Sequence, residues 1–99
     1  MYLSVIIPAY NEEKRIGKTL KSIATYLNQQ NYDAEVIVVN NRSTDSTADV
    51  VESFKDKISN LRLMKENHAG KGYAVRKGML EAKGIYRLFT DADNSTTID

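Results

Sequence analysis

The stretch that decides the fold class is Val36-Ile37-Val38-Val39, four apolar β-branched residues in a row. Such a run is typical of a strand that is buried on both faces of a sheet. A second run of the same kind, Val5-Ile6-Ile7, ends at Pro8. Strands buried on both faces belong mainly to parallel sheets with helices on each side. These two runs therefore predict an α/β protein with a parallel sheet.

The remaining chain alternates between helical patterns and further strands. Leu61 to Met64 and Tyr86 to Thr90 read as two more strands, and Asn11 is in position to cap the first helix. Three intervening segments carry apolar residues at helical spacing, namely Ile16, Leu20, Ile23 and Leu27, then Val50, Val51, Phe54 and Ile58, then Ala74, Val75, Met79 and Ala82. The predicted order is β-α-β-α-β-α-β. This order predicts a Rossmann-like three-layer αβα domain with a parallel four-stranded sheet across residues 1–99.

Composition narrows the classes of function. The chain has 99 residues, 41% of them hydrophobic, and a net charge of +1, so nothing in its charge attracts nucleic acid. The absence of cysteine excludes disulfides, thiolate catalysis and cysteine-bound zinc. Neither a signal-peptide pattern nor a membrane-spanning apolar run is present, so we expect a cytoplasmic domain.

An acidic pair, Asp91 and Asp93, follows the last predicted strand near the end of the chain. Carboxylate oxygens at the carboxyl end of a strand suit a hard cation, Mg²⁺ or Mn²⁺, which often carries substrate phosphates. The same carboxylates could equally cap a helix beginning near Ser95. The pair therefore predicts a metal site, with helix capping as its structural alternative.

The loops after the four strands should meet at one edge of the sheet. They offer an aromatic ring (Tyr10), amides (Asn40 and Asn41), a lysine between glycines (Lys71) and the acidic pair. Each has an ordinary explanation when taken singly, as a loop aromatic, turn residues, a tight helix entry or a solvated charge. The glycines fit neither a Walker loop nor a dinucleotide fingerprint, and the lone His68 receives no role. Together the groups suit a nucleoside diphosphate.

Four stretches in this order resemble the family 2 glycosyltransferases, inverting enzymes of the GT-A fold. They are Val5 to Glu13, Glu35 to Asp45, Gly70 to Met79, and Asp91-Ala92-Asp93, which lies at the place of the DXD metal motif. The third stretch is similar to the branch that transfers glucose or mannose to polyprenyl phosphates such as dolichyl phosphate. The resemblance implies an N-terminal donor-binding half of a GT-A domain, with UDP-glucose or GDP-mannose as donor.

The resemblance also implies roles for individual residues. Asn40 would read the base edge in the turn with Ser43. Asp93 would hold Mg²⁺ or Mn²⁺, with Asp91 either supporting it as a second ligand or bound to the sugar and ribose. The full implied nucleotide-sugar set is Pro8, Tyr10, Glu12, Asn40, Ser43, Lys71, Arg76 and Asp91.

Two departures from the family pattern affect the expected function. The usual Asp-Asp-Gly-Ser turn here reads Asn40-Asn41-Arg42-Ser43, which removes the charge that would strengthen a bond to the base. The catalytic base and the acceptor-binding half of the family lie downstream of the DXD motif. We therefore expect donor binding without transfer by this chain alone, and self-association through an uncovered sheet edge; in the full enzyme the reaction would lie at the cytoplasmic face of a membrane.

The sequence also leaves two alternative functions open. One is a non-catalytic interaction module of flavodoxin-like shape, and the other is half of a sugar-nucleotide pyrophosphorylase. The second would need a glycine-rich loop after the first strand, where this chain has Pro8-Ala9-Tyr10.

Overall fold

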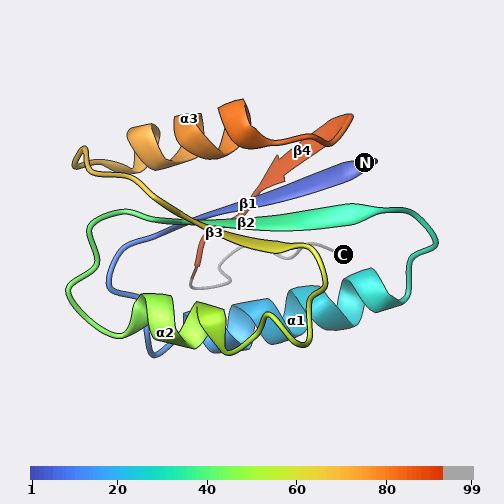
Figure 1. The fold of residues 1–99 in the computed structure, drawn as a ribbon, viewed down its shortest axis with the longest axis horizontal. Helices are drawn as coiled ribbons and strands as arrows, with labels where there is room; N and C mark the ends of the chain where they lie inside the picture. The colour runs from blue at the N-terminus through green and yellow to red at the C-terminus, as the bar shows by residue number, and fades with distance from the viewer. Residues whose placement is uncertain (93–99) are drawn as a thin grey trace.

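A computed structural model describes residues 1–92 and confirms the predicted alternation of strands and helices (Figure 1). All strand pairs are parallel, and the sheet order is β3-β2-β1-β4. The elements are β1 (Leu3–Ala9), α1 (Ile16–Asn28), β2 (Ala34–Asn40), α2 (Thr47–Glu52), β3 (Leu61–Lys65), α3 (Lys71–Glu81) and β4 (Tyr86–Phe89). The two apolar runs that predicted the fold form β1 and β2, the central strands.

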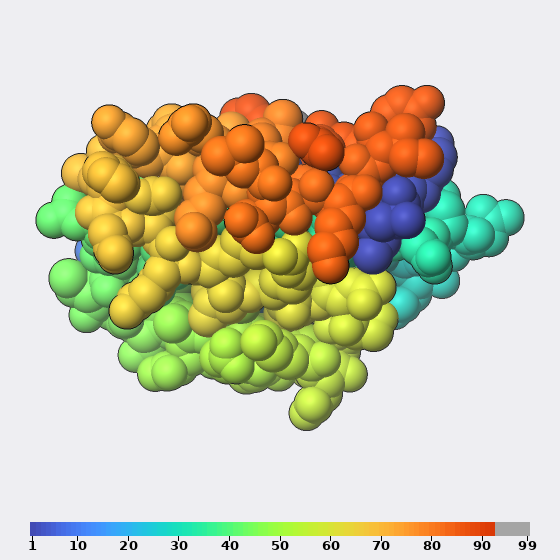
Figure 2. Space-filling model, turned by 45° about the horizontal axis from the view of Figure 1, so that its top comes forward, coloured from blue at the N-terminus to red at the C-terminus, as the bar shows by residue number. Residues whose placement is uncertain are grey.

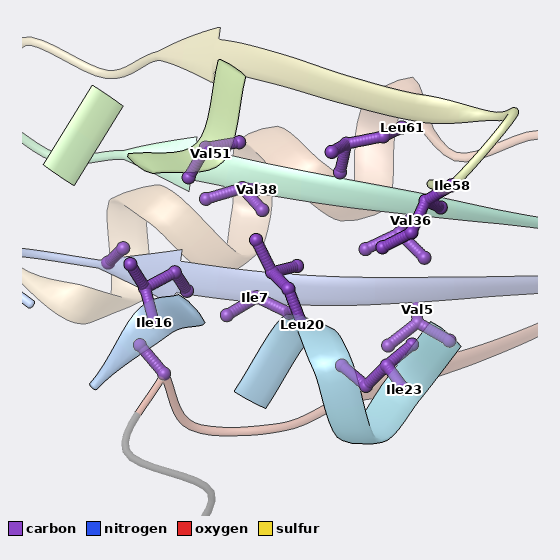
Figure 3. Packing of buried hydrophobic residues seen from close by; sticks show 12 residues of the cluster. Val5, Ile7, Ile16, Leu20, Ile23, Val36, Val38, Val51, Ile58 and Leu61 are labelled. Atoms are coloured by element: carbon purple, nitrogen blue, oxygen red, sulfur yellow. The ribbon is translucent and has the colours of Figure 1, made fainter. Parts of the chain in front are cut away.

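The sheet is the middle of three layers, with α1 and α2 on one face and α3 on the other (Figure 1). Alternate residues of the central strands supply each face, because successive side chains of a strand point to opposite sides. Val5, Ile7 and Val36 pack toward α1 and α2, as Figure 3 shows, whereas Ile6 and Ile37 belong to the cluster under α3. Burying each such aliphatic side chain contributes about 1.5–3 kcal/mol.

Strand β1 continues through Pro8, past the end predicted at Ile7. Its pairing with β4 ends at Ile6, opposite Phe89, and the Ile6 carbonyl accepts a hydrogen bond from the Thr90 amide at 3.0 Å. Backbone groups of a strand alternate between its two edges, so the nitrogen of Pro8 faces the β4 side beyond this last pair. A missing amide hydrogen therefore breaks no bond of the sheet.

Helix α3 lies unusually close to β1 because Gly78 faces it. A Cβ added at Gly78 would lie 2.4 Å from Cγ2 of Ile6, whose side chain is fully buried. Gly84, in the turn before β4, is equally close to β1, since a Cβ there would lie 2.6 Å from the Ser4 backbone nitrogen. Gly78 lets α3 pack closely on the sheet, and Gly84 lets the turn before β4 pass close to β1.

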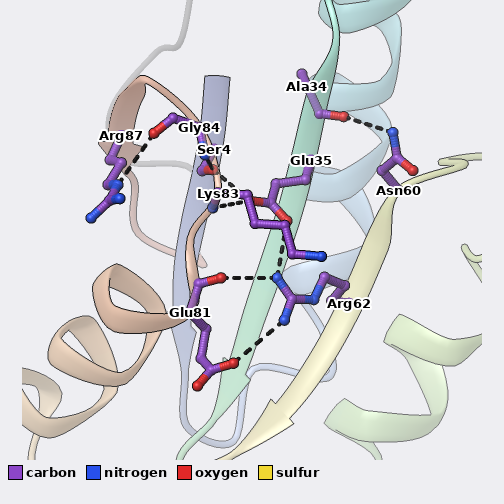
Figure 4. Close-up of polar contacts among 9 residues, drawn as sticks. All are labelled: Ser4, Ala34, Glu35, Asn60, Arg62, Glu81, Lys83, Gly84 and Arg87. Carbon is purple, nitrogen blue, oxygen red and sulfur yellow. Dashed lines mark hydrogen bonds and ion pairs between the residues drawn. The ribbon is translucent and has the colours of Figure 1, made fainter. Parts of the chain in front are cut away.

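A buried carboxylate ties the elements together at the amino ends of the strands (Figure 4). Glu35 accepts hydrogen bonds from the Ser4 hydroxyl at 2.6 Å, the Lys83 amide at 2.7 Å and Nη1 of Arg62 at 3.0 Å. Burial, the largest influence, acts to raise the pKa of Glu35, but the bonds from Ser4, Lys83 and Arg62 together lower it below its ordinary value. This network lies at the edge of the sheet opposite to the loops described below.

Strand β4 is an exposed edge. All four of its residues are exposed, and Leu80 and Ile85 beside it are 69% and 76% exposed. In Figure 2, α3 and the approach to β4 lie beside the N-terminal residues, in agreement with the bond from the Tyr86 amide to the Tyr2 carbonyl. Within residues 1–92, no helix has the length and apolar character needed to span a bilayer.

Candidate functional site

The loops at the carboxyl ends of the strands line an open cavity of about 620 Å³. This volume lies in the range of small-molecule and cofactor pockets. Four segments that are distant in the sequence line it: Pro8, Ala9, Tyr10 and Glu12; Asn41 and Arg42; Ala69, Gly70 and Lys71; and Asp91 and Ala92. The cavity therefore lies where the parallel topology predicts a ligand site.

Hydrogen bonds of Asn11 connect the loop after β1 to the loop after β2. Its backbone has a φ of 51°, and its side-chain Oδ1 accepts hydrogen bonds from the Thr44 amide at 2.8 Å and the Asp45 amide at 3.3 Å. The Asn11 amide itself donates to Oγ of Ser43 at 3.0 Å. The expectation that Asn11 caps the first helix was wrong, because α1 begins only at Ile16. Its side chain instead fixes one wall of the cavity.

The two asparagines at the end of β2 have different roles. Oδ1 of Asn40 accepts a hydrogen bond from the Ser43 amide at 3.2 Å, so this side chain closes its own turn. Asn41 is 6% exposed, lines the cavity, and donates from Nδ2 to the Gly70 carbonyl at 2.7 Å. Among residues 1–92, Oδ1 of Asn41 has no hydrogen-bond partner. A buried acceptor of this kind costs about 1–3 kcal/mol unless a donor reaches it, and its residue lines the cavity, which makes Asn41 a candidate partner for a ligand N–H.

Arg42 lines the same cavity in a strained backbone conformation. Its φ is 64°, in the left-handed region that costs a residue with a Cβ about 1–2 kcal/mol. Its side chain is exposed, and no carboxylate within the described part of the chain forms an ion pair with it. Strain held by surrounding structure is found most often at binding sites.

Lys71 and Asp91 form an ion pair across the cavity. Nζ of Lys71, the first residue of α3, is hydrogen-bonded to Oδ1 of Asp91, just after β4. The next residue, Ala92, is anchored to α1 by a 2.6 Å bond from the Thr19 hydroxyl to its carbonyl. The backbone of Gly70, with a φ of 121°, turns the chain into α3 in a conformation that glycine alone adopts without strain.

Five of the site residues expected from the sequence line the cavity. They are Pro8, Tyr10, Glu12, Lys71 and Asp91. Asn40 and Ser43 lie behind the wall in the turn that they form together, and Arg76 is exposed on α3 outside the lining. Asp93 lies outside the described residues. The sequence predicted Asn41 only as one of several polar loop residues and gave the base-edge role to Asn40; the place of Asn41 directly after a buried strand was the available signal.

The donor set around Asp91 is compatible with a hard cation. Residues 1–92 contain no cluster of three or more histidine or acidic side chains that could hold a metal by themselves. The Asp91 carboxylate, however, already binds the ammonium of Lys71 in the cavity, so positive charge is stabilised at this point. Asp91 would supply one oxygen ligand to Mg²⁺ or Mn²⁺; Asp93, the other residue expected to bind the metal, lies outside the described part of the chain.

The comparisons with known proteins agree with this geometry. The model of glycosyl transferase family 2 matches residues 4–99. The chain belongs to glycosyl transferase family 2. The expected GT-A fold is confirmed, because the family 2 structures that superpose on the chain are GT-A enzymes.

A curated family 2 relative has 43% identity over 104 residues: dolichyl-phosphate beta-glucosyltransferase ALG5D of Trichomonas vaginalis, with 99% of this chain and 32% of the relative covered. Among solved structures, S. aureus TarS 1-349 in complex with UDP has a TM-score of 0.83 and 36% identity, covering 94% of this chain and 28% of TarS. The mannosyltransferase PcManGT of Pyrobaculum calidifontis, in complex with GDP-Man and Mn²⁺, has a TM-score of 0.78 and 33% identity, with 92% and 27% covered. This family 2 chain thus spans about a third of the curated relatives that it matches.

Proposed function

We propose that the cavity binds the nucleoside diphosphate of a sugar donor. The observation that carries the proposal is that four different groups line the same 620 Å³ cavity. They are the exposed ring of Tyr10, the side-chain amide of Asn41, whose buried oxygen has no partner among residues 1–92, and the two cationic side chains of Arg42 and Lys71. UDP in TarS and GDP-Man in PcManGT support this choice of ligand class.

Each group has a distinct task in this proposal. The ring of Tyr10, 60% exposed, offers a stacking surface for the base. Oδ1 of Asn41 accepts a hydrogen bond from the ring N–H of the base, which both uracil and guanine carry. Arg42 and Lys71 neutralise the diphosphate, which bears most of the charge of the ligand. The base-edge role moves from Asn40 to Asn41, since Oδ1 of Asn40 is already bonded to Ser43.

We further propose that the larger enzyme transfers a hexose with inversion to a polyprenyl phosphate such as dolichyl phosphate. The curated relatives named as dolichyl-phosphate beta-glucosyltransferases support glucose as the sugar and hence UDP-glucose as the donor. A bound Mg²⁺ or Mn²⁺ would supply charge neutralisation on the leaving diphosphate. The described residues bind and orient the donor, and the 99-residue chain alone is expected to transfer nothing. We place the reaction of the larger enzyme at the cytoplasmic face of a membrane.

The pocket and the family match favour this function over a flavodoxin-like interaction module or half of a pyrophosphorylase. An interaction module gives no reason for an unsatisfied buried acceptor in a residue that lines a cavity. This chain also lacks the glycine-rich loop that a pyrophosphorylase would need after β1.

Asn41→Ala and Asn40→Ala form a matched pair that tests the proposal. UDP-glucose is titrated in Mg²⁺ by calorimetry into each variant, with GDP-mannose as the comparison donor. Loss of the base contact in Asn41→Ala should weaken binding about tenfold, whereas Asn40→Ala should change it by about twofold or less. Two-dimensional NMR spectra verify that both variants remain folded. Equal losses in the two variants, or a larger loss in Asn40→Ala, would contradict the assignment of base recognition to Asn41.

A further inference from the structure

We propose that the ammonium of Lys71 occupies the cation position beside Asp91 while no metal is bound. A divalent metal displaces this ammonium when the donor binds. The displaced ammonium then moves to the diphosphate. The proposal rests on the proposed function, because it concerns how the same cavity changes from its metal-free to its donor-loaded form. It begins from the contact between Nζ of Lys71 and Oδ1 of Asp91, two side chains that both line the cavity.

The position of Lys71 is locally unfavourable, and Asp91 compensates for it. Lys71 is the first residue of α3, where the helix dipole is positive and favours acidic side chains. The first turn of α3 has no acidic residue, and Gly70 supplies no side-chain cap. A lysine that opposes its helix yet faces a cavity is a departure from local rules of the kind found at functional sites. Asp91, which is distant in the sequence, provides the missing negative charge.

The ion pair between Lys71 and Asp91 is open to replacement by other ions and contributes little to the stability of the fold. The side chains of Lys71 and Asp91 are 57% and 35% exposed, so water and ions reach both. Exposed ion pairs of this kind contribute little to folding and are screened by salt. Lysine carries a compact charge on a flexible stem, so its ammonium can move between anionic partners. In its position beside Asp91, Nζ also lies 5.5 Å from the ring centroid of Phe89.

Coupling between metal and nucleotide follows from this arrangement. A divalent cation at Asp91 must displace or repel the Lys71 ammonium, which weakens binding of the metal alone. A diphosphate in the cavity gives Lys71 another anionic partner and lowers this cost. Metal and nucleotide therefore strengthen each other's binding, and the effect is reciprocal. Removing the lysine charge has opposite consequences for the two ligands, since the metal alone gains affinity whereas the nucleotide loses it.

The test compares Lys71→Met, which removes the charge, with Lys71→Arg, which keeps it. Lys55→Met is the matched control, because Lys55 pairs with Glu52 at 3.3 Å on an exposed surface away from the cavity. Binding of Mn²⁺ alone is measured by electron paramagnetic resonance, and binding of UDP at saturating Mn²⁺ by calorimetry. We expect Lys71→Met to bind Mn²⁺ about fivefold more tightly and UDP about fivefold more weakly than wild type. Lys71→Arg and Lys55→Met should stay within about twofold of wild type for Mn²⁺.

Unchanged Mn²⁺ affinity in Lys71→Met, or an equal gain in Lys55→Met, would overturn the exchange. So would absence of Mn²⁺ binding in every variant. If wild type binds UDP with Mn²⁺ but Lys71→Met leaves Mn²⁺ affinity unchanged, the exchange fails and the proposed function stands. If Lys71→Met gains Mn²⁺ affinity but no protein binds a nucleotide, the competition between Lys71 and the metal at Asp91 stands, whereas the proposed function and the transfer of the ammonium to a diphosphate both fail.

A measurement on the wild-type protein covers the case in which Lys71→Met does not fold. The ¹³Cε signal of Lys71 should shift when Mg²⁺ is added without nucleotide, and shift further with UDP. A Lys71 signal that is indifferent to Mg²⁺ would overturn the exchange.

Discussion

Replacing Arg42 by glycine should make the protein more stable and a weaker nucleotide binder. Arg42 has a φ of 64°, and the left-handed region costs a residue with a Cβ about 1–2 kcal/mol. Glycine removes this cost but gives the unfolded chain more freedom, worth about 0.5–1 kcal/mol. The net gain therefore lies between about 0 and 1.5 kcal/mol, with a central value of about 0.75 kcal/mol. For a domain of this length, that gain raises Tm by about 3–6 °C.

Two further substitutions separate backbone strain from charge. Arg42→Ala removes the guanidinium but keeps a Cβ at positive φ, so it should bring no gain in stability. Arg42→Asn should gain less than Arg42→Gly, because asparagine tolerates the left-handed region better than most residues. Since each variant loses the same cation from the cavity, all three should bind UDP about three- to tenfold more weakly.

Thermal unfolding followed by circular dichroism gives the stabilities, and calorimetry gives the affinities. A glycine variant no more stable than the alanine variant would refute the strain argument. Unchanged UDP affinity in all three variants would show that Arg42 faces solvent without a ligand role.

The other predictions concern packing, pH and assembly. In α3, Gly78→Ala should destabilise the fold by about 2 kcal/mol, because the new Cβ meets the buried Ile6. Gly72→Ala should instead stabilise the fold by about 0.5 kcal/mol, because a Cβ there has no neighbour within 4 Å. Urea unfolding of the two variants measures both changes. Glu35→Gln should cost about 3 kcal/mol at neutral pH. Because the folded-state pKa of Glu35 is lowered, the stability difference between wild type and Glu35→Gln should be largest above the ordinary glutamate pKa. It should decrease as pH falls through the folded-state pKa. Identical acid unfolding curves of wild type and Glu35→Gln would contradict this prediction. Sedimentation should show concentration-dependent self-association through the β4 edge, suppressed by Leu88→Lys, and a monomer at all concentrations would argue against that interface.

The element order could be predicted from the sequence because its signals are local. Wholly apolar runs such as Val36 to Val39 specify buried strands, and apolar residues at helical spacing indicate the helices between them. The second helical pattern reaches too far, because α2 ends at Glu52 and leaves Phe54 and Ile58 beyond the helix. The end of β1 was misplaced because a proline usually ends a strand. Whether Pro8 breaks the sheet depends on where β4 stops, which the sequence near Pro8 does not contain.

The location of the cavity could be predicted from the sequence, but the hydrogen bonds of its residues could not. Parallel strands bring their following loops to one edge, so Tyr10, Lys71 and Asp91 could be grouped in advance. The different roles of Asn40 and Asn41 could not, because these residues are adjacent and chemically identical. What separates them is contact with distant backbone: Asn41 bonds to Gly70, whereas Asn40 bonds within its own turn.

The central claim is that the loops after the strands form a working site for a nucleotide sugar. Two-dimensional NMR of the labelled chain, titrated with UDP-glucose in Mg²⁺ and then without it, tests this claim most directly. We expect Mg²⁺-dependent shifts concentrated on Tyr10, Asn41 and Lys71, with the Glu35 network at the opposite edge undisturbed. A well-dispersed spectrum that neither UDP-glucose nor GDP-mannose changes would contradict it.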